Sequence, residues 1–145
     1  MSAESNLATV RRIVHEAWNQ RRLEVLDEVI ATDFVNHDPA DPEDVRGIDA
    51  FKERVRGYHT AMPDLVVTIE EGFASGDLVA TRWNARGTNE GELAGMPPTH
   101  KTMSITGMSI DRFDADGRLC ETWDQWDNLG FMTQLGLIPE TAAAG

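Results

Sequence analysis

In the stretch 58–70, YHTAMPDLVVTIE, the spacing of the apolar residues changes from that of a helix to that of a strand. Before Pro63, apolar side chains recur every three or four residues, which predicts a helix that ends at the proline. After it, Leu65, Val67 and Ile69 occupy every second position of a segment rich in β-branched residues, which predicts a strand. The chain is therefore expected to be helical in its first half and to form a sheet in its second half.

Three helices are expected before this change of pattern. In the first, apolar residues recur at helical spacing between Leu7 and Trp18, with charged residues on the opposite side. A shorter helix is expected at 23–30, and a third at 48–62. Between them, the sequence NHDPADP at 36–42 contains two prolines and several short polar side chains, which predict an ordered loop.

Turn sequences in the second half separate further strands. ASGD at 74–77 and DADG at 114–117 are typical of tight turns. Long strands are expected at 78–86, 102–113 and 118–126. Because short loops connect these strands, neighbours are expected to be antiparallel. Helices followed by strands predict an α+β domain, a cone in which the N-terminal helices cover one face of a curved antiparallel sheet.

Length and composition favour one globular domain. The chain has 145 residues, of which 41% are apolar and 26% charged, and these fractions are close to those of average globular proteins. We therefore expect a single domain over residues 1–145. Its core is expected at about 7–137, and the tail TAAAG at 141–145 is expected to fray.

Charge and cysteine content exclude several classes of function. A formal charge of −12 repels phosphate backbones, so nucleic acid is not expected as a partner. The single Cys120 can form neither an internal disulfide nor a multi-cysteine zinc site, and the four histidines lack the spacing of a catalytic zinc site. No metal or other cofactor is expected. Without a signal sequence or an apolar run of about 18 residues, the protein is expected in the cytoplasm and not in a membrane.

The strand expected at 118–126 holds the most informative candidate for chemistry. On a period of two residues, Thr122, Asp124 and Trp126 share one face of the strand. If that face lines a closed cavity, lost hydration raises the pKa of the Asp124 carboxyl, which suits proton transfer near neutral pH. The alternative is an Asp124 that is paired with an arginine or lies on an exposed acidic edge.

Two other aspartates are weaker candidates. Asp127 is expected at the end of the strand, where water reaches it, and Asp111 is expected near a charged hairpin. Asp124 is therefore expected to be the principal acid–base group.

Four short motifs follow one another along the chain: FVNHD at 34–38, AGMPPT at 94–99, WD at 123–124 and QLG at 134–136. Their order resembles that of the SnoaL-like polyketide cyclase family, and the similarity extends from about residue 7 to residue 137. The resemblance implies a fold like that of nuclear transport factor 2, in which a curved sheet and its covering helices enclose a pocket.

The resemblance also implies a reaction. In that family an aspartate of the final strand is the acid–base group of an intramolecular aldol ring closure that uses neither metal nor cofactor. Aligning the QLG motif without a gap places Asp124 at that position, and Asn36 matches a pocket asparagine. The family carries a glutamine and a histidine where this chain has Gly107 and Ser109. We expect Asn36 or His37 to supply the missing hydrogen-bond donor, so that Asp124, Asn36 and His37 are the predicted catalytic residues.

The predicted substrate-binding residues are Trp126, Ser109, Trp83, Met103 and Gly107, and Met108 and Phe113 are further candidates for the pocket wall. A wall of large apolar side chains with few polar groups favours a small apolar ketone, similar to a polyketide. Aromatic and methionine side chains at strand spacing are also typical of an ordinary core.

Other functions are compatible with the same pattern. A site like that of an epoxide hydrolase would combine Asp124 with Arg82, although Asn84 stands where a second aspartate is needed. An isomerase-like site would need a tyrosine donor, and Tyr58 lies late in the third helix. A small-molecule-binding protein without catalysis is the remaining alternative. A homodimer is expected, because a second copy can cover the outer face of the sheet.

Overall fold

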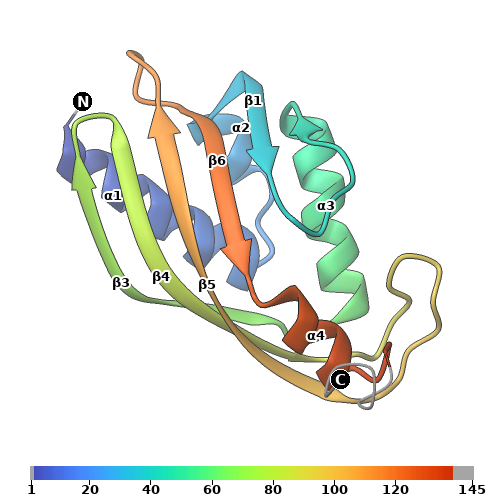
Figure 1. Cartoon of the computed structure of the whole chain (residues 1–145). Helices are drawn as coiled ribbons and strands as arrows, with labels where there is room; N and C mark the ends of the chain where they lie inside the picture. The colour runs from blue at the N-terminus through green and yellow to red at the C-terminus, as the bar shows by residue number, and fades with distance from the viewer. Residues whose placement is uncertain (1, 139–145) are drawn as a thin grey trace.

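The computed structural model describes residues 2–138 and shows an α+β domain (Figure 1). Its helical segments are α1 (Ala3–Arg12), the π-helix η1 (Ile13–Asn19), α2 (Val25–Val29), α3 (Ile48–Ala61) and α4 (Asn128–Gln134). Its strands are β1 (Ile30–His37), β2 (Val45–Arg46), β3 (Val66–Ser75), β4 (Leu78–Thr88), β5 (Thr102–Phe113) and β6 (Leu119–Trp126). The strands form one six-stranded sheet in the order β2-β1-β6-β5-β4-β3. The expected flexible tail, 141–145, lies outside the described residues.

The helices lie against one face of the curved sheet. α1 contacts β3 and β4, η1 contacts β3, and α3 contacts β1 and β2. Figure 1 shows α1 crossing the long strands, while α3 runs beside β1 and α4 follows directly on β6. The predicted α+β fold with helices covering a curved sheet is confirmed, and the change from helix to strand falls at Pro63, as expected.

Burial along β5 shows how the sheet separates its two faces. Every second residue from Met103 to Phe113 is buried, and the intervening residues are exposed. Because strand side chains alternate between faces, the buried set points toward the helices. The interior therefore receives Ser109 and Asp111 from this strand, together with its apolar residues.

Two apolar clusters fill the space between helices and sheet. The first joins α1, η1, α2, α3 and β1, and at its centre the rings of Phe34 and Phe51 lie 5.2 Å apart, edge to face. The second joins the end of α3 to β4, β5 and α4, and here the ring of Phe131 meets Trp126 at 5.3 Å. Aromatic pairs of this geometry add to the stability supplied by their burial.

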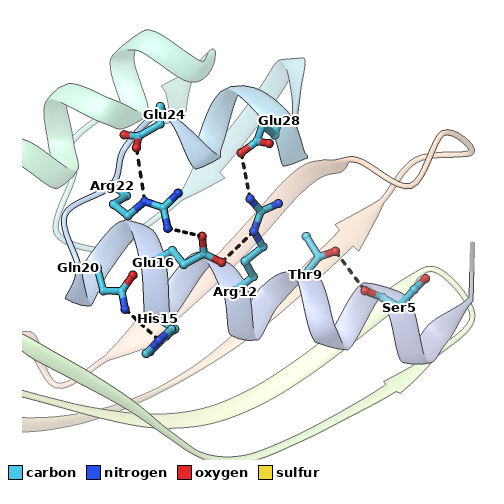
Figure 2. Close-up of polar contacts among 9 residues, drawn as sticks. All are labelled: Ser5, Thr9, Arg12, His15, Glu16, Gln20, Arg22, Glu24 and Glu28. Atoms are coloured by element: carbon cyan, nitrogen blue, oxygen red, sulfur yellow. Dashed lines mark hydrogen bonds and ion pairs between the residues drawn. The ribbon is translucent and has the colours of Figure 1, made fainter.

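Ion pairs join the first helical segments to α2 (Figure 2). The carboxylate of Glu16 accepts hydrogen bonds from Arg12 Nε at 2.9 Å and from Arg22 Nη1 at 3.1 Å. Arg12 also reaches Glu28 of α2 at 2.9 Å. Because exposed ion pairs contribute at most about 1 kcal/mol each, this network orients α2 more than it stabilises the fold.

The N-terminal edge of the sheet differs from the expectation. Ile30 was predicted to end a helix and Asn36 to begin a loop, with no element predicted at 31–35, but residues 30–37 form β1. Because β1 and β2 precede α3, the expected order of all helices before all strands is wrong. This strand pairs in parallel with β6, with Asn36 opposite Thr122, and antiparallel with β2, with Asn36 opposite Val45. The sheet is therefore mixed and not antiparallel throughout. The partner strand β6 lies far along the chain, so tertiary pairing outweighed the local turn signals.

The outer face of the sheet carries exposed apolar side chains. Phe73 of β3 and Met108 and Ile110 of β5 are all exposed. Met108 was a candidate for the pocket wall, and its position on this face shows that this expectation was wrong. Whether a second copy covers the outer face stays a prediction. Among the helices of residues 2–138, none is both long enough and apolar enough to cross a membrane.

Candidate functional site

The space between the helices and the sheet contains a cavity of about 150 Å³ that is partly open to solvent. Apolar side chains from α1, η1, α3, β3, β4 and β5 supply most of its wall. The polar residues that line it are Asn36, Asp38, Arg54, Tyr58, Thr81, Ser109, Asp111, Thr122 and Asp124. A mostly apolar cavity with a few converging polar groups is the usual form of a small-molecule site.

Asp124 lies in the middle of this polar set. Its Oδ1 accepts a hydrogen bond from Ser109 Oγ at 2.5 Å, and its Oδ2 accepts one from Asn36 Nδ2 at 2.9 Å. The register explains this arrangement, because Ser109 is opposite Asp124 on β5, and Asn36 lies on β1 at the other side of β6. The structure therefore brings together Asp124 and Asn36, as the sequence predicted.

Burial raises the pKa of the Asp124 carboxyl above its ordinary value, and the hydrogen bonds from Ser109 and Asn36 oppose that rise. Both oxygens already have a donor, so the carboxylate is held in one orientation. A carboxylate that is fixed and poorly hydrated is a stronger base than one in water.

Trp83 extends the hydrogen-bonded chain on the other side of Asp124. Its indole Nε1 donates to Ser109 Oγ at 2.9 Å, so two consecutive hydrogen bonds connect Trp83 of β4, Ser109 of β5 and Asp124 of β6. The cavity wall includes Trp83, Trp126, Met103 and Ser109, four of the five predicted substrate-binding residues.

Gly107 has a different part in the site from the one predicted. A Cβ atom built on Gly107 would lie 2.4 Å from Cζ2 of Trp83 and 2.8 Å from Cβ of Trp126. The absence of a side chain leaves room for these two residues on the inner face of β5. Gly107 therefore shapes the wall through its neighbours.

Replacing Gly107 with alanine is expected to destabilise the protein by about 2 kcal/mol, because an overpacked core must displace rigid indole rings. Urea unfolding measures this loss. The matched control is Gly57→Ala in α3, where nothing lies within 4 Å of the new Cβ. Alanine there is expected to stabilise the helix by up to about 1 kcal/mol. Equal effects of the two substitutions would contradict the packing argument.

His37 lies on the opposite face of β1 from Asn36, because consecutive strand residues alternate. Its Nε2 contacts Glu121 Oε2 at 2.7 Å, its Nδ1 contacts Asp44 Oδ1 at 3.0 Å, and its ring stacks on Trp123. The hydrogen bond to Glu121 is the main cause of a raised His37 pKa. The expectation that His37 joins Asp124 in the pocket is wrong. His37 belongs to strand β1 and not to a loop, and its side chain lies on the face of that strand away from the cavity.

The arrangement needed for an epoxide hydrolase-like site is not assembled. Arg82 lies on the outer face of β4, half exposed, with its Nε 3.7 Å from Glu71 Oε1. Asn84 donates to Glu70 on the same face. Neither side chain lines the cavity that contains Asp124.

A second polar group forms part of the cavity wall near Trp126. The indole Nε1 of Trp126 donates to the carboxylate of Asp38 at 3.0 Å, and Arg54 Nη2 lies 2.7 Å from Asp38 Oδ2. The guanidinium of Arg54 also lies over the ring of Tyr58. Burial raises the pKa of Tyr58 to about 12, so its hydroxyl keeps its proton. Tyr58 was set aside because of its place in the helix, yet its side chain lines the cavity.

Asp111 was also set aside, and the structure corrects that expectation. It is 6% exposed, lines the cavity and accepts a hydrogen bond from Thr122 Oγ1 at 2.5 Å. The signal was present in the sequence, because Asp111 has the same strand parity as Ser109. Asp111 was nevertheless ranked below Asp124, because it lies close to the charged hairpin at 114–117.

Metal-ligating side chains do not gather in the described part of the chain. Among residues 2–138, no group of three or more His, Cys, Asp or Glu side chains is placed to hold a metal ion. The polar residues of the cavity supply instead carboxyl, amide and hydroxyl groups in a mostly apolar wall. Such groups can take up, donate and orient protons.

Comparison with known protein families gives one match. Residues 8–135 match the family described as SnoaL-like polyketide cyclase. No curated protein matches the chain.

Solved structures with similar folds include IdmH from Streptomyces antibioticus, a proposed polyketide cyclase. It is 34% identical, with a TM-score of 0.76, and the match covers 90% of this chain and 98% of that one. AclR from Streptomyces galilaeus, a proposed hydroxylase, is 27% identical, with a TM-score of 0.81 over 95% of this chain and 100% of that one. A SnoaL-like protein from Jannaschia sp. CCS1 has a TM-score of 0.85 over 94% of this chain and 95% of that one; at 24% identity it shows the fold alone.

Proposed function

The chain belongs to the SnoaL-like polyketide cyclase family, and we propose that it catalyses cofactor-independent acid–base chemistry on an apolar, polyketide-like ketone. The reaction is an intramolecular aldol-type ring closure. The observation that carries the proposal is the partly buried Asp124 carboxyl, which lines a mostly apolar cavity and is oriented by Asn36 and Ser109. The similarity to IdmH, a proposed polyketide cyclase, gives further support.

The chemistry needs little machinery. A carbon next to a carbonyl group, or between two, is already acidic because its enolate places the negative charge on oxygen. The Asp124 carboxylate removes one proton from that carbon, and the resulting enol or enolate carbon attacks a second carbonyl of the same molecule. Holding the two carbons together in the cavity supplies much of the rate, because the encounter becomes a unimolecular step.

The cavity also favours a class of substrate. Its volume of about 150 Å³ resembles that of a dry cavity that holds one benzene ring, so we expect it to enclose one ring of a larger molecule. Trp83, Trp126 and Met103 provide apolar contact surface. The formal charge of −12 repels phosphorylated metabolites before they reach the site.

An enolisable aromatic ketone tests this function. We expect 2-tetralone to raise the melting temperature of the protein, and glucose 6-phosphate to leave it unchanged. We also expect the protein to accelerate incorporation of solvent deuterium at C1 of 2-tetralone, measured by NMR against the rate in buffer. Benzophenone, which has no acidic C–H, is the control for binding without exchange. Binding of 2-tetralone with exchange at the buffer rate would contradict the proposal and indicate a binding protein.

A further inference from the structure

Asp111 is a second carboxyl group in the cavity of Asp124, and the reaction described above does not use it. We propose that Asp111 is a second catalytic residue, which gives a proton to the carbonyl oxygen of the substrate while Asp124 takes a proton from the neighbouring carbon. This inference rests on the proposed function and assigns the oxygen side of the same reaction.

The register of the sheet places the two carboxyl groups on one face. Asp111 is opposite Thr122, and Ser109 is opposite Asp124. Asp111 and Asp124 are therefore diagonal neighbours on adjacent strands, a relation that separates their backbones by about 7 Å. A carbonyl oxygen and the carbon next to it fit between two groups at this separation.

The hydrogen bonds decide which carboxyl group keeps a proton. Asp124 accepts two, from Ser109 and Asn36, and both stabilise its ionised form. Asp111 accepts one, from Thr122. Because each donated hydrogen bond stabilises the ionised form, the carboxyl group with fewer donors keeps its proton to higher pH. Asp124 is thus the base and Asp111 the acid.

Within the described residues 2–138, the cation that lines the cavity is Arg54, and it is not placed to reverse this order. The titratable groups that face the cavity besides Asp111 are Asp38 from the loop after β1, Arg54 and Tyr58 from α3, and Asp124 from β6. The cation Arg54 is paired with Asp38 at 2.7 Å and with Asp41 at 2.7 Å. The residues of α1 and η1 that line the cavity are apolar or aromatic, and β4 contributes the uncharged Thr81.

Burial raises the pKa of Asp111 from an ordinary value of 3.8 to about 7. The hydrogen bond from Thr122 opposes this rise, and the negative charge of Asp124 adds to it. A carboxylic acid that stays neutral near pH 7 can donate a hydrogen bond or a proton to an oxygen in its cavity.

The step balances without a further reactant. The C–H bond breaks and its proton goes to the Asp124 carboxylate, while its electron pair forms the new C=C bond. The electrons of the C=O π bond move to oxygen, which takes the proton of Asp111, and the product is an enol. The enol carbon then attacks the second carbonyl. The enol O–H returns its proton to Asp111 as its C=O bond re-forms, and the new alkoxide takes the proton held by Asp124, so both carboxyl groups return to their starting states.

The first test is the pH dependence of deuterium exchange into 2-tetralone, after subtraction of the rate in buffer. In the wild type we expect the rate to fall above about pH 7, as Asp111 loses its proton. In Asp111→Asn we expect a rate about 10²-fold lower below pH 7, and no such fall above it. Asparagine has the same size as aspartic acid but cannot give up a proton. An unchanged rate and an unchanged pH profile in this variant would overturn the inference.

A second variant raises the pKa of the Asp111 carboxyl without removing that group. Thr122→Val deletes the hydrogen bond that stabilises the Asp111 carboxylate, so the fall in rate is expected to shift to higher pH. The control is Thr106→Val, which changes an exposed threonine on the outer face of β5 and is expected to leave the profile in place. If Asp111 were only structural, Thr122→Val would leave unchanged the pH at which the exchange rate falls.

The two proposals fail in different ways. Exchange at the buffer rate by the wild type contradicts the proposed function itself. Exchange that depends on Asp124, but is indifferent to Asp111→Asn and to Thr122→Val, leaves that function in place and overturns only the role of Asp111.

Discussion

Replacing Asp124 with asparagine is expected to lower the rate of deuterium exchange into 2-tetralone by about 10³-fold, because the amide cannot accept a proton. Asparagine fills the same volume, and Asn36 and Ser109 can still bond to its side chain after the amide reorients. The rise in melting temperature caused by 2-tetralone is therefore expected to persist. Loss of exchange with retained binding separates catalysis from pocket shape.

Asp127→Asn is the matched control for this substitution. Asp127 is exposed at the end of β6, and its Oδ1 accepts a hydrogen bond from Gly130 N at the start of α4. Asparagine caps a helix about as well as aspartate, so the fold is expected to tolerate the change. Exchange is expected at the wild-type rate. A loss in Asp127→Asn equal to that in Asp124→Asn would show that the base had been assigned to the wrong aspartate.

Local patterns were sufficient for the parts of the fold whose partners are close in sequence. The third helix was predicted at 48–62 and α3 covers Ile48–Ala61, while the strand at 102–113 has the bounds of β5. In both, the spacing of the apolar residues matches the face that is buried. Asp124 was found in the same way, since its parity with Trp126 on β6 determines which side of the sheet it occupies.

The errors arose where tertiary pairing decided the structure. β1 was missed because its hydrogen-bonding partner β6 comes far later in the chain, and the prolines after it suggested a loop. That error carried His37 into the predicted site, because a loop residue can point in any direction whereas a strand residue alternates with its neighbour. The place of Tyr58 depended on how α3 packs beside the sheet, and no pattern within the helix specifies this.

The stability of the wild type is expected to decrease as the pH rises from about 4 to 8, through the contribution of Asp111. The folded protein holds the Asp111 proton with a pKa of about 7, whereas the ordinary value is 3.8. The folded state therefore binds this proton more tightly than the unfolded state does. The resulting stabilisation is complete below about pH 4, is lost progressively above it, and is gone above about pH 7. This sign is opposite to that of a carboxylate whose pKa is lowered on folding.

The difference between Asp111→Asn and the wild type isolates the titration of Asp111 together with its coupling to Asp124, because titrating groups remote from the cavity contribute equally to both proteins. The free energy of unfolding of the asparagine variant minus that of the wild type is expected to be about 4 kcal/mol larger at pH 8 than at pH 4. That is a large share of the 5–15 kcal/mol that usually stabilises a domain of this size. Urea unfolding at several pH values measures it, with Asp116→Asn in the exposed turn as the control. Parallel pH profiles for the wild type and Asp111→Asn would show that Asp111 is ionised in the folded protein and cannot be the acid, because a buried group that holds its proton at neutral pH must destabilise the fold when that proton is lost.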